Sequence, residues 1–155
     1  MLGSVRARVG YLVARRLFHW AWLVKQPRAW DWMQGQFARM AARGDAEVQS
    51  FYGHLLLFRG QGLSARQEGL RLLRLAATAG DGKAAYQLGV VSLAGDLQQS
   101  ADAGVAAAWW VKAATVGHPL AARRLAGLYA QGGVGLAADP QQAALYEARA
   151  TELGL

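Results

Sequence analysis

Histidines and acidic residues are the side chains of this 155-residue sequence that could carry out acid–base or metal chemistry. The histidines are His19, His54 and His118, and no two of them have the i, i+3 or i+4 spacing that places two metal ligands on one helix face. The acidic residues are scattered, with no pair placed for general acid–base catalysis. Cysteine is absent, which removes thiolate nucleophiles and thiolate zinc sites. We therefore expect no catalytic residue, no metal site and no cofactor, and a protein that is not an enzyme.

A glycine-rich segment, Gly132-Gly133-Val134-Gly135, could be mistaken for a phosphate-binding loop. It lacks the Lys-Ser/Thr ending of a nucleotide-binding loop, and it follows a predicted helix rather than a strand. This segment is more typical of the loop between two helices of a hairpin.

The excess of positive over negative charge lies in the N-terminal quarter of the chain. Residues 1–43 contain eight basic residues and one acid, Asp31, so they account for the whole net charge of +7. The remaining nine basic and nine acidic residues cancel over residues 44–155. Four of the six tryptophans also lie in this first segment: Trp20, Trp22, Trp30 and Trp32. The chain thus has a basic, tryptophan-rich head and an electrically neutral body.

Two interpretations of residues 1–43 remain open. The first is an irregular helical hairpin that caps one end of a repeat array, which such arrays need. The second is an amphipathic helix on an anionic membrane, with arginines at lipid phosphates and tryptophans at the headgroup boundary. The residues that this second interpretation uses are Arg6, Arg8, Arg15, Arg16, Trp20 and Trp22. Nucleic-acid binding is a weaker hypothesis, because the basic segment is rich in apolar residues and carries no recognition motif.

The apolar run from Val5 to Val24 does not fit a transmembrane helix, because Arg15 and Arg16 interrupt it. The same two arginines argue against a cleaved signal peptide, and no small-x-small cleavage site follows before the tryptophan cluster. We expect a cytoplasmic protein, attached peripherally to the inner face of a membrane if residues 1–26 contact lipid.

An internal repeat organises the rest of the chain. Gly44, Gly80, Gly117 and Gly154 are separated by 36, 37 and 37 residues, and each follows a short alanine- or threonine-containing stretch. Other pairs keep the same register. These pairs are Leu88 with Leu125, Asp102 with Asp139, Ala106 with Ala143, and Trp109 with Tyr146. The repeats therefore cover residues 44–79, 80–116 and 117–154.

Each repeat predicts two helices joined by a loop. The first helices are expected at 46–58, 83–94 and 120–131, and the second helices at 65–78, 102–116 and 140–153. Asp139 before Pro140 predicts an N-cap, Ser64 with Gln67 predicts a capping box, and the four spaced glycines predict left-handed helix ends. No segment alternates with the period of a strand, so the sequence predicts an all-α fold.

The small residues predict close packing between these helices. Gly89 lies inside a predicted helix, where glycine costs about 1 kcal/mol, so we expect it to allow a neighbouring backbone to approach closely. Leu88, Leu125, Trp109 and Tyr146 are then the expected large residues of the core. A single hairpin cannot bury its apolar face, so stacked hairpins must share one.

The segment Leu88-Gly89…Asp102…Ala106…Trp109…Ala113-Ala114…Gly117 resembles the Sel1-like repeat, a relative of the tetratricopeptide repeat. Residues 121–154 resemble it again through Gly132-Gly133-Val134-Gly135, Asp139, Ala143, Tyr146 and Gly154. The resemblance is weaker over 44–80 and fades in 1–43. It implies a right-handed α-solenoid of antiparallel helical hairpins, with about three repeats of 36–37 residues and an N-terminal helical cap. It also implies an adaptor that binds a protein or peptide rather than a catalyst.

A partner-binding surface is expected on the first helix of each repeat, which lines the concave side in the related tetratricopeptide fold. Equivalent positions there are Ser50, Tyr86 and Arg123, then Phe51, Gln87 and Arg124, with His54 one turn further on. A peptide could lie along this column, with Arg123 or Arg124 meeting an acidic side chain or a terminal carboxylate. The alternative is that both arginines only form part of a solvent-exposed helix face and bind no partner.

Overall fold

The computed structural model describes residues 2–20, 22 and 25–155, and over these residues the protein is all-α, as predicted. No strand forms in this part of the chain, although an isolated bridge joins Gly133 and Leu136 within their loop. The helices are α1 (Leu2–Leu17), α3 (Pro27–Ala41), α4 (Ala46–Arg59), α5 (Gly62–Thr78), α6 (Gly82–Ala94), α7 (Ala103–Thr115), α8 (Pro119–Gln131) and α9 (Pro140–Glu152).

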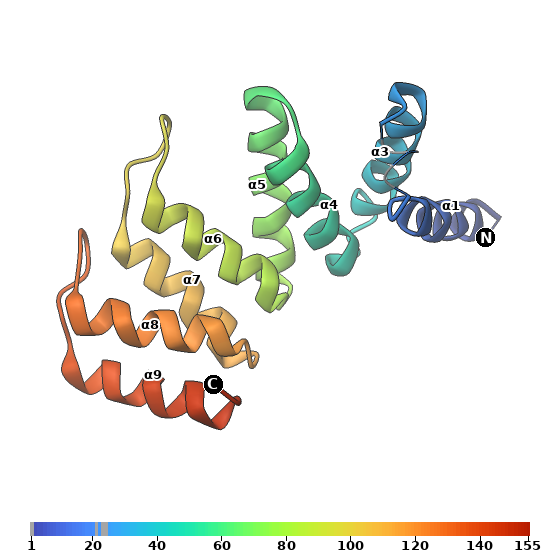
Figure 1. Ribbon diagram of the computed structural model, residues 1–155. Coiled ribbons are helices and arrows are strands. Elements are labelled where there is room, and N and C mark those ends of the chain that lie inside the picture. The colour runs from blue at the N-terminus through green and yellow to red at the C-terminus, as the bar shows by residue number, and fades with distance from the viewer. Residues whose placement is uncertain (1, 21, 23–24) are drawn as a thin grey trace.

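The helices stack in chain order as a solenoid. The hairpins α4/α5, α6/α7 and α8/α9 correspond to the three repeats, and each hairpin joins the next through α5 with α6 and α7 with α8. Figure 1 shows α1 and α3 at one end of this series and α9 at the other. The three hairpins confirm the solenoid that the glycine spacing predicts.

The helix ends follow the sequence signals closely. Asp45, Asp81, Asp102 and Asp139 each accept a hydrogen bond from a backbone N–H in the first turn of the helix that follows. The four spaced glycines all have φ between 85° and 99°, a left-handed conformation that ends the preceding helix at little cost only for glycine. Each boundary between repeats is therefore marked by a glycine that ends one helix and a cap residue that begins the next.

The predicted capping box at Ser64 is wrong. Helix α5 begins at Gly62, before Ser64 instead of after it. Its N-cap residue is Gln61, which makes no side-chain hydrogen bond to the helix. Ser64 consequently lies inside the first turn, and Gln67 donates instead to the side chain of Gln98 in the loop after α6, at 3.3 Å.

The core is divided between two large clusters. One cluster surrounds Phe37 and joins α1, α3, α4 and one residue of α5, Leu72. The other cluster surrounds Trp110 and joins α5 to α8, and its α5 residues include Leu70 and Leu73, on either side of Leu72. Helix α5 therefore contributes to both clusters and connects the N-terminal helices to the repeats.

The large core residue of the second repeat is Trp110, not Trp109 as the register suggests. Trp110 is 1% exposed, and its indole N–H donates to the carbonyl of Tyr86 at 3.0 Å. Trp109 is only half-buried, with the ammonium of Lys112 4.9 Å from its ring centroid. Gly89 accommodates the indole of Trp110, since a Cβ at this position would overlap that ring. The expectation of a close backbone approach at Gly89 is therefore corrected to a side-chain contact.

Candidate functional site

The first two residues of the predicted surface column make contacts within the protein: Ser50 contacts the next repeat, and Phe51 contacts the N-terminal helices. Ser50 is buried, and its hydroxyl donates to the Asp81 carboxylate at 2.9 Å. The half-buried ring of Phe51 packs edge-on against Phe37 and Phe18 in the N-terminal core cluster. These contacts bury Ser50 and leave Phe51 only partly exposed.

A simple rule describes the first of the two equivalent positions. Ser50 contacts Asp81, the N-cap residue of the following repeat, and Tyr86 contacts His118, which is the N-cap residue one repeat further on. Arg123, the third member, lies 3.9 Å from Glu147 of its own hairpin. The position therefore links neighbouring repeats where a following repeat exists in the described chain.

Tyr86 lies at the centre of an aromatic cluster between the second and third repeats. Its ring stacks on the imidazole of His118, with a centroid distance of 4.6 Å and an angle of 11° between the planes. The indole of Trp110 lies on another side of Tyr86, at a centroid distance of 6.4 Å. The guanidinium of Arg124 lies over both rings, 5.8 Å from the Tyr86 centroid and 6.0 Å from that of Trp110.

The arrangement leaves Arg124 with unused binding capacity. Arg124 is exposed, and none of the ion pairs in the described part of the chain includes it. Rings against the flat face of a guanidinium restrict its motion but leave the N–H groups at its edge available. Such an arginine is suited to a bidentate contact with a carboxylate.

Positive charge from a second residue acts on the same cluster. Burial lowers the pKa of His118 below its ordinary value of 6.5, and the positive charge of nearby Lys83 lowers that pKa further. Lys83 is exposed on α6, one turn before Tyr86. Residues at the starts of α6 and α8, including Asp81, Lys83 and His118, line a shallow depression of about 600 Å³. We refer to Lys83, Tyr86, His118 and Arg124 as the Tyr86 surface.

Two remaining residues of the predicted column lie outside this cluster. His54 is half-buried, with its Nδ1 2.7 Å from the carbonyl of Ser50 and its ring stacked against Phe58 at 6.3 Å. Gln87 is half-buried on α6, next to Tyr86 in the sequence. The structure thus brings Tyr86 and Arg124 together and separates them from Ser50, Phe51 and His54.

The solved structure of a Sel1 repeat protein from Oxalobacter formigenes is similar to this chain. The two share 30% sequence identity over 77% of this chain and 88% of the other, with a TM-score of 0.65. The chain belongs to the Sel1-like repeat family. A protective antigen of uropathogenic Escherichia coli that displays an SLR fold also matches, at 18% identity and a TM-score of 0.48. That match covers 99% of this chain but only 39% of the antigen. No protein-family model matches the chain, and no curated protein matches it in sequence.

Within this Sel1-like repeat protein, the sequence itself contains a signal for the role of His118. His118 follows Gly117 as Asp81 follows Gly80 and Asp45 follows Gly44, so it occupies the N-cap position of the third repeat. Its ring Nδ1 accepts a hydrogen bond from the N–H of Ala121 at 3.3 Å. The role of Lys83 had no such signal, because it depends on how α6 lies against the next repeat.

The helices that precede the Sel1-like repeats separate the predicted membrane-contact residues into two groups. Arg15 faces the protein: it donates to Glu47 at 2.7 Å and to the Tyr11 hydroxyl at 3.4 Å. Arg8, Arg16, Trp20 and Trp22 are exposed. The side chain of Arg6 lies outside the described residues.

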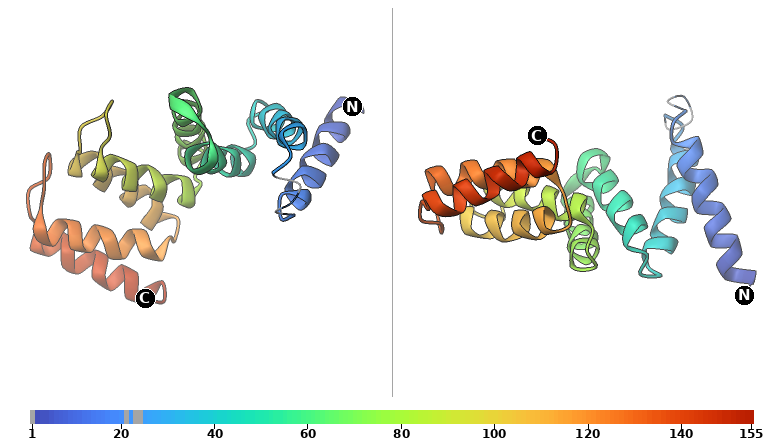
Figure 2. Two further views of the ribbon diagram at one scale, coloured as in Figure 1. Left: turned by 45° about the horizontal axis from the view of Figure 1, so that its top comes forward. Right: turned by 90° about the horizontal axis from the view of Figure 1, so that it is seen from below.

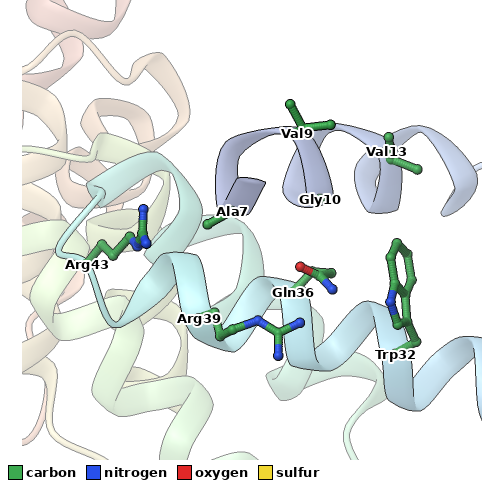
Figure 3. A pocket seen from close by; sticks show the side chains of 8 residues that line it. All are labelled: Ala7, Val9, Gly10, Val13, Trp32, Gln36, Arg39 and Arg43. Atoms are coloured by element: carbon green, nitrogen blue, oxygen red, sulfur yellow. The ribbon is translucent and has the colours of Figure 1, made fainter. Parts of the chain in front are cut away.

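A cleft of about 700 Å³ lies between α1 and α3, beside the contact that these two helices make. Figure 3 shows Ala7, Val9, Gly10 and Val13 on the α1 side, and Trp32, Gln36, Arg39 and Arg43 on the α3 side. One wall is therefore apolar and the other carries an aromatic ring and cations.

The residues that the structure describes form neither a metal-binding cluster nor a membrane-spanning helix. No group of three or more His, Cys, Asp or Glu residues there could hold a metal ion. No helix in that part of the chain has the length and apolar character needed to cross a bilayer.

Proposed function

We propose that this Sel1-like repeat protein is a non-catalytic scaffold that binds a protein partner through the Tyr86 surface. The partner contributes an acidic segment or a terminal carboxylate. The observation that carries this proposal is the guanidinium of Arg124, positioned over Tyr86 and Trp110 with no acidic side chain of the described chain paired to it.

The physical argument begins with the cost of ordering a long side chain. An exposed arginine normally loses rotamer freedom when it binds, and this loss offsets much of the gain from a surface ion pair. The two rings near the guanidinium reduce that loss before the partner arrives. A carboxylate that meets Arg124 is therefore bound more tightly than one that meets a surface arginine without such neighbours.

Neighbouring groups favour the same kind of ligand. Lys83 adds a second positive charge on α6, and the stacked rings of Tyr86 and His118 offer an apolar surface next to it. A segment with an acidic residue beside an apolar one would complement both features. Arg123 contributes less, because it points to Glu147 of its own hairpin.

The experiment compares the wild-type chain with Arg124→Glu and Arg74→Glu as immobilised baits in an extract of the native host. Arg74 is an exposed arginine of α5, so its reversal is the matched control for charge. Proteins that bind the wild type and Arg74→Glu but not Arg124→Glu would be the expected partners. Each would then be purified and titrated against the three chains.

We expect the Arg124→Glu variant to weaken such a complex at least about tenfold, since it replaces a charge-assisted hydrogen bond with repulsion. Circular dichroism would check that the variants keep their helices. An unchanged set of bound proteins for all three chains, or partners without an acidic segment at the contact, would refute the assignment to the Tyr86 surface.

A further inference from the structure

The outer side of α1 is an apolar surface that no described residue covers. Val5, Val9, Leu12 and Val13 recur at the i, i+4, i+7 and i+8 spacing of one helix face, and they are between 44% and 61% exposed. The opposite face of α1 packs against the protein through Tyr11 and Ala14, which are both buried. Helix α1 is thus apolar on two sides, of which only one is used within the chain.

The two ends of the solenoid differ in this respect. Figure 2 shows α1 as the outermost helix at one end, with α3 between it and the repeats. At the other end, Glu147 of α9 is exposed at the position that the buried Leu73 and Trp110 hold in the earlier repeats. Thr151 is likewise exposed where the equivalent Ala77 and Ala114 are buried. At these two positions α9 therefore carries exposed polar residues, whereas the outer side of α1 carries a continuous row of exposed apolar residues.

The charge around the α1 face indicates what covers it. Arg16 follows Leu12 and Val13 on the same side of the helix, Arg8 precedes Leu12 by one turn, and both are exposed. Residues 1–43 carry eight basic residues and a single acid. Two copies of this face would bring like charges together, so a second copy of the chain is a poor occupant. The occupant must be both apolar and anionic.

The features beside α1 fit a lipid surface. Trp20 and Trp22 follow the end of α1 and are more than 60% exposed, as expected for side chains at the level of lipid headgroups. The cleft between α1 and α3 shares Val9 and Val13 with the apolar face, and Arg39 lies on its opposite wall (Figure 3). An acyl chain could lie against the valines while a phosphate meets the arginine.

From these observations we propose that α1 binds in the plane of an anionic membrane surface. Its valine–leucine face enters the boundary between headgroups and acyl chains, and Arg8 and Arg16 contact lipid phosphates. This attachment is separate from the Tyr86 surface and does not depend on it. The repeats are then held at the membrane with their own surfaces free.

Vesicle flotation with the full chain tests the proposal. The vesicles contain phosphatidylcholine alone or phosphatidylcholine mixed with phosphatidylglycerol. We expect the chain to float only with the anionic vesicles, and less so as the salt concentration rises. Leu12→Glu should weaken this binding at least about tenfold, because it removes a leucine from the face that enters the membrane and adds a negative charge. Leu145→Glu, at an exposed leucine of α9, should leave the binding unchanged.

Adjacent arginines provide a sharper control. Arg16→Gln removes a cation from the proposed lipid face and should weaken binding about fivefold. Arg15→Gln removes the same charge from a residue that faces Glu47 and should leave the binding unchanged. The proposal is overturned if the anionic vesicles are not bound, or if Arg15→Gln and Arg16→Gln act equally. A dimer in sedimentation velocity that Leu12→Glu dissociates would also overturn it, in favour of a second copy.

Discussion

The imidazole of His118 lies flat against the phenol ring of Tyr86, with centroids 4.6 Å apart, and the same imidazole caps α8 by accepting from the N–H of Ala121. One side chain therefore joins the second and third repeats and also begins the first helix of the third. The equivalent residue of the previous repeat, Asp81, likewise caps α6 and contacts the preceding repeat through Ser50. In this protein, the N-cap residue is also the contact between repeats.

This double role predicts a pH dependence of stability. Because the pKa of folded His118 is below its ordinary value of 6.5, the unfolded chain takes up the proton more readily than the folded chain. The stability due to neutral His118 is thus complete above about pH 6.5 and is lost as the pH falls through the lower folded-state pKa. Protonation removes the acceptor at Nδ1 and places a positive charge at a helix N-terminus.

Urea denaturation of the wild type and His118→Asn from about pH 7.5 to about pH 5, a range that includes the ordinary histidine pKa, measures this effect. Asparagine retains the cap but does not titrate. We expect the free energy of unfolding of the wild type to fall more steeply than that of the variant. Parallel curves would show that His118 does not couple stability to pH.

A second prediction concerns two glycines inside helices. Gly89→Ala should destabilise the protein by about 1–3 kcal/mol, because the new methyl group overlaps the buried indole of Trp110. Gly127→Ala is the control, because a Cβ there meets nothing within 4 Å. It should stabilise the protein by about 0.5–1 kcal/mol through helix propensity. Thermal denaturation gives both values, and the same sign for both variants would contradict the packing around Trp110.

A third prediction concerns the hydrogen bond between Ser50 and Asp81. Asp81→Ala removes both the cap of α6 and the acceptor of the Ser50 hydroxyl, whereas Ser50→Ala removes only the hydrogen bond. A double-mutant cycle should give a coupling energy of about 1–2 kcal/mol, since Ser50 is buried and Asp81 is charged. Asp45→Ala, which loses only a cap, should cost about 1 kcal/mol. Equal losses for Asp45→Ala and Asp81→Ala, with no coupling to Ser50, would argue against this link between repeats.

A fourth prediction is that the ion pair between Arg15 and Glu47 contributes little to stability. Its two side chains are 46% and 71% exposed, so water and salt screen their attraction. Glu47→Gln should lower the free energy of unfolding by less than about 1 kcal/mol, and molar salt should abolish the difference. A larger, salt-independent loss in chemical denaturation would mean that the pair positions α1 against α4 more firmly than its exposure suggests.

The repeat boundaries could be predicted because they depend on local chemistry. A glycine at positive φ and an aspartate cap act within a few residues, so their spacing was visible in the sequence and gave helix ends close to those observed. The start of α5 was missed because Gln61 and Gly62 carry no side-chain cap signal. The burial of Trp110 rather than Trp109 was also missed, since the two adjacent tryptophans lie on different sides of α7, and packing against α6 decides which side is buried.

The sequence alone determined the all-α hairpins, their number and the concentration of positive charge in residues 1–43, because these properties depend on residue type and spacing along the chain. Only the tertiary structure decided which of these side chains remain accessible to solvent. It buried Ser50, paired Arg15 with Glu47, placed Arg124 over Tyr86, and left the valine face of α1 exposed. The physical reason is that a helix fixes which residues share a face, whereas packing between helices determines which face remains exposed to solvent.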